Sequence, residues 1–249
     1  MSTAVAAFLI IAAFLTATLS GIFGMAGGLI LMGALAFVLP VSAAFVTHGV
    51  LQFVANGWRA ALHRRHVKWR IIAYYAMGSA GAGAIIAMLA FVPSKPMLFL
   101  LLGLVPMLVW LPKGWVSLDA SRTPDALLSG LLVTGMNLTA GVAGPLLDLF
   151  FVRTALTRHE IVATKAATQA LSHSVRIIIF GLPLIGNAAS HIPPWWVFAL
   201  AIPSSMVGTV IGGRFLNAMS DINFKAWTAW IITAIGIIYL IKAANLWGA

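Results

Sequence analysis

The stretch "HGVLQFVANGWR" at residues 48–59 carries four polar side chains inside a run that is otherwise apolar. These side chains are His48, Gln52, Asn56 and Arg59. Their spacing of four, four and three residues predicts one face of an α-helix, because neighbours on a helical surface lie three and four positions apart. The stretch therefore predicts an apolar helix with a single polar stripe.

The composition of the whole chain indicates the solvent around this helix. Of 249 residues, 61% are hydrophobic and 8% are charged, whereas an ordinary soluble domain has about 25% charged residues. The mean hydropathy is +1.03, and apolar runs recur at roughly the 20 residues needed to cross a bilayer. The sequence therefore predicts an all-α, multi-pass integral membrane protein without a separate soluble domain.

The net charge and the N-terminus each allow a different interpretation. A formal net charge of +10 is compatible with nucleic-acid binding, but the basic residues cluster in short loops between apolar segments, as topology signals do. The N-terminal run at residues 1–21 resembles a signal peptide, but it lacks the positively charged segment that usually begins one. We therefore expect no nucleic-acid partner, and we expect residues 4–20 to lie in the bilayer.

The polar stripe occurs twice in the chain. A shift of 117 residues aligns two glycine-rich segments, 20–28 and 137–144. The stripe that follows the second segment has the spacing of the first and consists of Lys165, Gln169, His173 and Arg176. We therefore predict two homologous membrane repeats, residues 1–112 and 125–249, joined by a cytoplasmic linker at 113–124.

The lysines and arginines other than Arg59 and Arg176 predict how the repeats are oriented. Parallel repeats would divide them about evenly, seven to six. If each repeat instead opens with a hairpin that returns to its starting side, eleven fall in the cytoplasm, and only Lys95 and Lys242 lie outside. Cytoplasmic loops carry an excess of Lys and Arg. We therefore predict inverted repeats, each a re-entrant or broken-helix hairpin plus three transmembrane helices, although residues 4–20 are also long enough to span fully.

This arrangement predicts a site for a small anion. Inverted repeats with broken helices meet near the membrane midplane, where the N-termini of half-helices attract negative charge. The chain has only five acidic residues and no cysteine, so we expect neither a cation substrate nor a metal or other cofactor. The predicted binding residues are Gly24, Gly27, Gly28, His48, Gln52, Asn56, Arg59, Gly141, Gly144, Lys165, Gln169, His173 and Arg176.

These features also have simpler interpretations. Glycines in membrane helices often permit close packing, and a single Gln or Asn often links two helices by a hydrogen bond. Arg59, Arg176 and Lys165 are also compatible with side chains that extend to the membrane interface. The recurrence of one stripe beside matching glycine-rich breaks favours a binding site.

The glycine-rich segments "SGIFGMAGG" at 20–28 and "TAGVAG" at 139–144 and the stretch "THGVLQFVANGWRAALHRRHVKWR" at 47–70 resemble the TauE/SafE family of sulfite and organosulfonate exporters. With the duplicated layout, the resemblance covers nearly the whole chain. It implies export of a small sulfur-containing anion, sulfite or a small organosulfonate, across a bacterial inner membrane. The second half has Pro145 in place of the second glycine of "GG", so we do not expect equivalent half-sites.

Two other classes of function remain open from the sequence. An intramembrane enzyme with His48 or His173 as a base would need a nucleophile or a metal cluster. The sequence offers no Ser–His–acid set with a suitable spacing, no cysteine and no paired carboxylates. An assembly factor for another membrane complex is compatible with the sequence.

Overall fold

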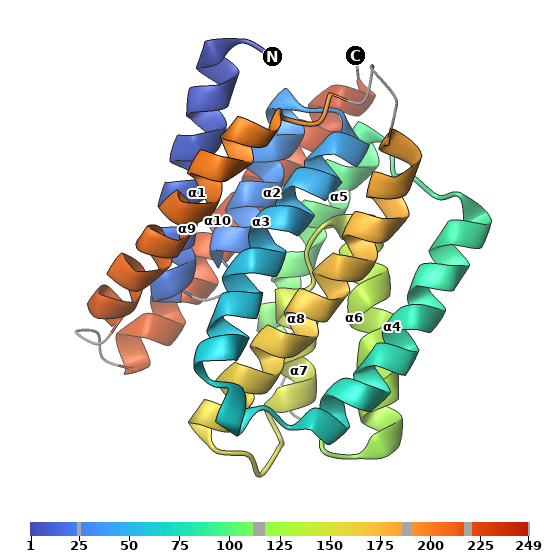
Figure 1. Ribbon diagram of the computed structural model, residues 1–249, viewed down its shortest axis with the longest axis vertical. Helices are drawn as coiled ribbons and strands as arrows, with labels where there is room; N and C mark the ends of the chain where they lie inside the picture. Colours follow the sequence, from blue (N-terminus) through green and yellow to red (C-terminus); the bar gives the residue numbers. More distant parts are fainter. Residues whose placement is uncertain (24–25, 112–117, 186–190, 217–220, 249) are drawn as a thin grey trace.

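The computed structural model describes residues 1–23, 26–111, 118–185, 191–216 and 221–248. In these ranges the regular structure is helical, and the helices lie side by side in a bundle (Figure 1). The helices of the first half are α1 (Thr3–Phe23), α2 (Ala26–Val38), α3 (Val41–Leu62), α4 (Trp69–Leu89) and α5 (Lys95–Leu104). Those of the second half are α6 (Thr123–Ala140), α7 (Gly144–Phe151), α8 (Arg158–Gly181), α9 (Trp195–Leu216) and α10 (Asp221–Trp247).

The predicted all-α membrane fold is confirmed by the length and composition of the helices. Four segments among the described residues are long and apolar enough to cross a membrane, namely Thr3–Ile22, Trp69–Leu89, Trp195–Phe215 and Ala229–Trp247. The helices α3 and α8 are as long, with 22 and 24 residues, but they carry the polar stripes. Large apolar side chains such as Met88 (86% exposed) and Trp195 (80% exposed) face outward, as expected where lipid is the solvent.

Each half opens with a hairpin of one longer and one shorter helix. The short helices α2 and α7 have 13 and 8 residues, which at about 1.5 Å per residue is less than the roughly 30 Å of a bilayer core. In Figure 1, α1 starts and α2 ends at the end where both chain termini lie, whereas α6 starts and α7 ends at the opposite end. Gly141 ends α6 with a φ of +78°, a left-handed conformation that favours glycine.

The long helices α3 and α8 cross the centre of the bundle and run antiparallel. Near the start of α3, the rings of Phe45 and Phe180 lie 4.7 Å apart. Past the other end of α3, the rings of His66 and His159 lie 5.3 Å apart. Around this pair, α1 packs on α9, α4 packs on α6, and α5 packs on α10.

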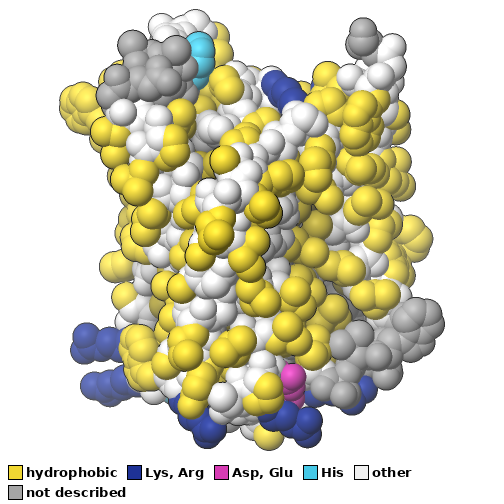
Figure 2. Space-filling view, turned by 90° about the vertical axis from the view of Figure 1, so that its right-hand side faces the viewer, with side chains coloured by type: hydrophobic (Ala, Val, Ile, Leu, Met, Phe, Trp, Pro, Cys, Tyr) yellow, Lys and Arg dark blue, Asp and Glu magenta, His cyan; other side chains and the backbone are white. Residues whose placement is uncertain are grey.

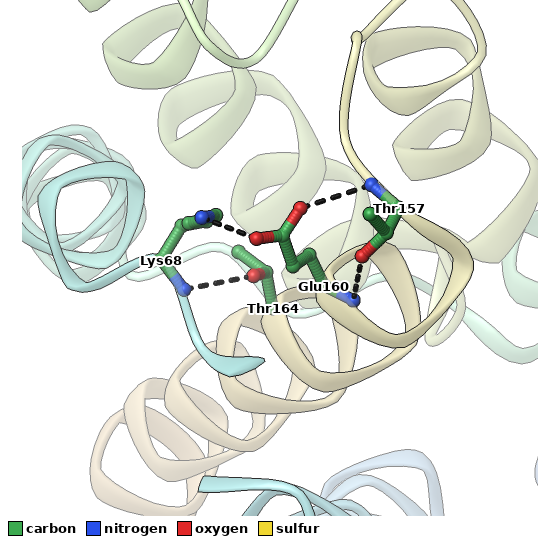
Figure 3. A network of polar contacts seen from close by, with 4 residues as sticks. All are labelled: Lys68, Thr157, Glu160 and Thr164. Atoms are coloured by element: carbon green, nitrogen blue, oxygen red, sulfur yellow. Dashed lines mark hydrogen bonds and ion pairs between the residues drawn. The ribbon is translucent and has the colours of Figure 1, made fainter. Parts of the chain in front are cut away.

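Basic side chains gather at one end of the molecule (Figure 2). There Lys68 forms an ion pair with Glu160 at the start of α8, and its backbone N–H donates to the Thr164 hydroxyl at 3.0 Å (Figure 3). The loops that follow α3 and α7 therefore meet at this end. At the opposite end, Lys95 and Lys242 both contact Phe37. The two groups of basic side chains thus lie at opposite ends of the bundle.

Candidate functional site

Arg176, on α8, is the centre of a buried polar cluster. Its side chain is fully buried, and its Nη2 donates to the carbonyl oxygens of Asn137 and Gly141, the latter at 2.6 Å. Its Nη1 lies 2.6 Å from Nδ1 of His48, and its Cζ lies 5.2 Å from the centroid of the Phe45 ring. The guanidinium thus joins α8 to α3 and to the end of α6.

The contacts of His48 define its tautomer. A guanidinium has only donors, so Nδ1 of His48 must accept from Arg176. The proton of a neutral ring is then on Nε2, which lies 3.0 Å from the carbonyl oxygen of Gly28 and donates to it. Both ring nitrogens are therefore engaged by protein groups, and His48 connects Arg176 to the start of α2.

A chain of side-chain hydrogen bonds extends from this cluster toward α4 and α6. The Asn137 amide donates to the Ser172 hydroxyl at 2.9 Å and lies 3.5 Å from Nδ1 of His173, whose ring is 5.5 Å from that of His48. Ser172 in turn donates to Thr134 at 3.1 Å. The chain ends in two further buried hydroxyl groups that contact Thr134, those of Ser79 and Tyr75.

The cluster contains a buried positive charge, Arg176, that has no carboxylate partner in the part of the chain that the structure describes. The ion pairs among the described residues are Lys68–Glu160 and Lys165–Asp148, and neither involves Arg176. Nε of Arg176 and Oδ1 of Asn137 are buried without a hydrogen-bond partner. Burying a charge that is not paired is costly, so an anion that paired with Nε of Arg176 would offset part of that cost.

A second polar cluster surrounds a small cavity between α1, α3 and α9. Its lining includes the three remaining polar side chains of the first stripe, Gln52, Asn56 and Arg59. Hydroxyl side chains of Thr16, Ser20, Ser205 and Thr209 complete the polar part of the wall. The cavity volume is about 20 Å³, which is room for about one water molecule.

Asn56 and Arg59 differ in how they meet this cavity. The Asn56 amide donates to the backbone oxygen of Gln52 at 3.0 Å and to its Oε1 at 3.3 Å. This contact engages the carbonyl end of the Gln52 side chain and leaves its NH₂ group as a donor. Arg59 takes part in neither of the two ion pairs among the described residues. Its guanidinium also forms no hydrogen bond with another described residue.

The other predicted site residues are distributed around these two clusters. Gly28 lies between them, since a Cβ placed there would be 3.6 Å from Nε2 of Gln52. A Cβ on Gly27 would collide with the backbone of α1, so Gly27 serves helix packing. Lys165 forms an ion pair with Asp148 of α7, and Gln169 is half-buried on α8. Gly144 begins α7, whereas Gly24 lies outside the described residues.

The structure therefore divides the predicted site into two groups. One consists of Gly28, Gly141, His48, His173 and Arg176, and the other of Gln52, Asn56 and Arg59. Sequence reasoning missed the buried partners Asn137, Ser172, Thr134, Ser79 and Tyr75. Asn137 could have been predicted from its position at the start of the glycine-rich segment 137–144. A single hydroxyl group in an apolar helix does not by itself indicate a buried hydrogen bond.

The apolar helices and the polar interior identify a polytopic membrane protein. Residues 9–239 of the chain match the family model described as sulfite exporter TauE/SafE. The chain therefore belongs to the TauE/SafE family of membrane transporters, and the resemblance inferred from the glycine-rich segments and the first stripe is confirmed. No curated protein and no solved structure matches the chain.

Proposed function

We propose that this protein exports a small sulfur-containing anion, sulfite or a small organosulfonate, across a bacterial inner membrane. The anion passes a site near the midplane, where α3 and α8 cross. The observation that carries this proposal is the fully buried Arg176, which has no carboxylate partner among the described residues. An anion of three oxygens suits a guanidinium, which presents parallel N–H donors.

The packing of the helices supports inverted repeats. If α1 to α5 correspond to α6 to α10 in order, the contact of α1 with α9 corresponds to that of α6 with α4. The contacts of α3 with α8 and of α5 with α10 each join a helix to its own counterpart. A pseudo-twofold axis in the membrane plane has these properties.

The same axis places the two glutamines at one depth. His48 and His173 are neighbours on antiparallel helices, so four residues forward along α3 and four residues back along α8 lead to Gln52 and Gln169. Their amides are neutral donors that can hold an oxyanion without trapping it. We propose that these amides line the path between the two arginines of the stripes.

The described arrangement fits a closed state of the half that contains Arg176. Nη2 of Arg176 is bound by the carbonyls of Asn137 and Gly141, and Nη1 is bound by His48. Nε of Arg176 has no hydrogen-bond partner among the described residues, but an anion that takes both terminal nitrogens of the guanidinium must displace these acceptors. The exchange would release the start of α2 and the end of α6, and it would thereby couple binding to movement of the two hairpins.

The electrical driving force suffices for export. Moving one negative charge out of a negative interior is favourable by about 2.3 kcal/mol for each 100 mV. A proton relay in a membrane usually employs Asp or Glu, and the chain has five such residues in all. We therefore propose electrogenic uniport.

Counterflow in proteoliposomes with sulfite, sulfate, thiosulfate and small sulfonates tests the proposal. We expect sulfite or a small sulfonate to exchange and to respond to a potassium–valinomycin potential at equal pH. Arg176→Gln should reduce this flux at least about tenfold, whereas Arg65→Gln, in the exposed basic loop, should retain it. Absence of flux for every anion would contradict the proposed function, and flux that follows only a pH gradient would contradict uniport.

A further inference from the structure

The cavity beside Arg59 occupies the position in the first repeat that the Arg176 cluster occupies in the second. The shift of 117 residues relates Arg59 to Arg176 and Ser20 to Asn137. A shift of 130 residues aligns the glycine-rich segment "GSAGAG" at 78–83 with "GTVIGG" at 208–213. The same shift relates two hydroxyl residues of α4 to two that line the cavity, Tyr75 to Ser205 and Ser79 to Thr209.

The two positions differ in how they are filled. Around Arg176, the fully buried Tyr75 of α4 stands at the position related to Ser205, and Nη1 and Nη2 of Arg176 are bound by His48 and by carbonyls. Around Arg59, the smaller Ser205 of α9 stands at that position, a cavity remains, and Arg59 has no ion pair among the described residues. The Arg176 position is thus filled by side chains, whereas a small cavity remains at the Arg59 position.

We propose that the cavity between α1, α3 and α9 is a separate anion site, in which Arg59 and Gln52 hold one singly charged oxyanion of the sulfite or sulfonate type. This inference rests on the proposed function and assigns the binding step to a position distinct from Arg176. Arg59 supplies two parallel N–H donors for two oxygens, and Gln52 supplies the amide N–H for the third. Asn56 acts as a positioning residue, because it fixes the carbonyl end of Gln52.

The chemistry of the lining favours a monoanion. The hydroxyl groups of Thr16, Ser205 and Thr209 donate to carbonyls of their own helices. Among the described residues that line the cavity, Arg59 is the one that carries a charge. A second negative charge would remain uncompensated in a region of low dielectric. Hydrogensulfite and alkylsulfonates therefore fit better than sulfate.

The position of Arg59 places this site on the side of the basic loops. Arg59 lies three residues before the end of α3, next to Arg64 and Arg65, whereas Arg176 lies toward the opposite end of the antiparallel α8. A basic surface raises the local concentration of anions. The cavity has room for about one water molecule, and an oxyanion is larger, so binding requires α9 to move away from α3.

Binding of methanesulfonate and of sulfite to the purified full-length protein in nanodiscs, measured by calorimetry, tests the site. We expect Arg59→Gln to weaken binding about tenfold or more and Arg59→Lys to weaken it less. Ser205→Tyr should abolish binding without a change of charge, because it places in the cavity the side chain that Tyr75 supplies at the related position on α4. The matched control Arg64→Gln, on the exposed loop, should bind as the wild type does.

Each outcome separates this inference from the proposed function. Wild-type flux together with unchanged affinity in Arg59→Gln would overturn the Arg59 site and leave transport intact. A wild type that neither binds nor transports these anions would overturn both. Monodispersity and melting without anion show whether each variant folds, and if Ser205→Tyr does not fold, the comparison of Arg59→Gln with Arg59→Lys decides.

Discussion

The junction between hairpin and long helix is made differently in the two halves. In the first half, the neutral ring of His48 on α3 donates to the Gly28 carbonyl of α2. In the second half, Lys165 on α8 forms an ion pair with Asp148 of α7, and the 117-residue shift relates Lys165 to His48. One position in the sequence pattern therefore joins the same pair of elements by two chemistries.

The chemistry of each junction follows its burial. The His48 junction is fully buried and includes Arg176, so a neutral acceptor at this position avoids a second buried cation. The Lys165 and Asp148 side chains retain 26% and 37% exposure, where water screens a charge and makes an ion pair tolerable. The burial of each junction thus determines whether a neutral hydrogen bond or an ion pair is the more stable contact there.

Labelling of single cysteines tests whether the two halves are inverted, and its outcome is all or none. The chain has no cysteine of its own, so Arg65→Cys and Arg158→Cys each introduce a unique thiol. We expect an impermeant thiol reagent to modify both from the cytoplasmic side, because their loops are joined by the His66–His159 and Lys68–Glu160 contacts. Labelling of the two positions from opposite sides would rule out inverted repeats.

The second prediction concerns the cost of breaking each junction. His48→Leu leaves the Gly28 carbonyl and Nη1 of Arg176 unpaired in a buried site, so it should lower the free energy of unfolding by about 1–3 kcal/mol. Lys165→Met exposes an unpaired but partly hydrated Asp148 and should cost about 1 kcal/mol or less. Denaturant titration in micelles measures both, and an equal or larger loss for Lys165→Met would contradict the inferred difference in burial.

A double-mutant cycle sharpens this prediction. If the Lys165–Asp148 pair contributes through mutual attraction, Lys165→Met combined with Asp148→Leu should cost less than the sum of the two single substitutions. Additive effects would show that the pair is not coupled. The cycle also tests whether the positive charge of Lys165 serves the hairpin, as the ion pair indicates, or the predicted anion site.

The sequence predicts the elements that depend on local spacing. The spacing of the two stripes predicts the helices α3 and α8, and the glycine-rich breaks predict the hairpins that precede them. The division of the site into two clusters was not predictable, because it depends on which helix packs beside each stripe. Ser205 and Thr209 of α9 line the cavity together with Arg59, and Tyr75 of α4 joins the other cluster. These residues are far from their neighbours along the chain, where no local pattern operates.

The smallest expected effect lies at the basic end, where Lys68 and Glu160 join the halves (Figure 3). The ammonium of Lys68, followed by the backbone N–H of Thr157, lowers the pKa of Glu160 from 4.5 to about 2. A lowered pKa means that this carboxylate stabilises the fold above about pH 4.5 and that the contribution disappears as the pH falls toward 2.

Because the pair is exposed to solvent and screened by salt, Glu160→Gln should lower the melting temperature only slightly at pH 7. The difference from the wild type should shrink between pH 4.5 and pH 2 and in high salt. A difference that shrinks with falling pH but does not respond to salt would show that Glu160 acts through the Thr157 cap of α8 and not through the ion pair between the halves.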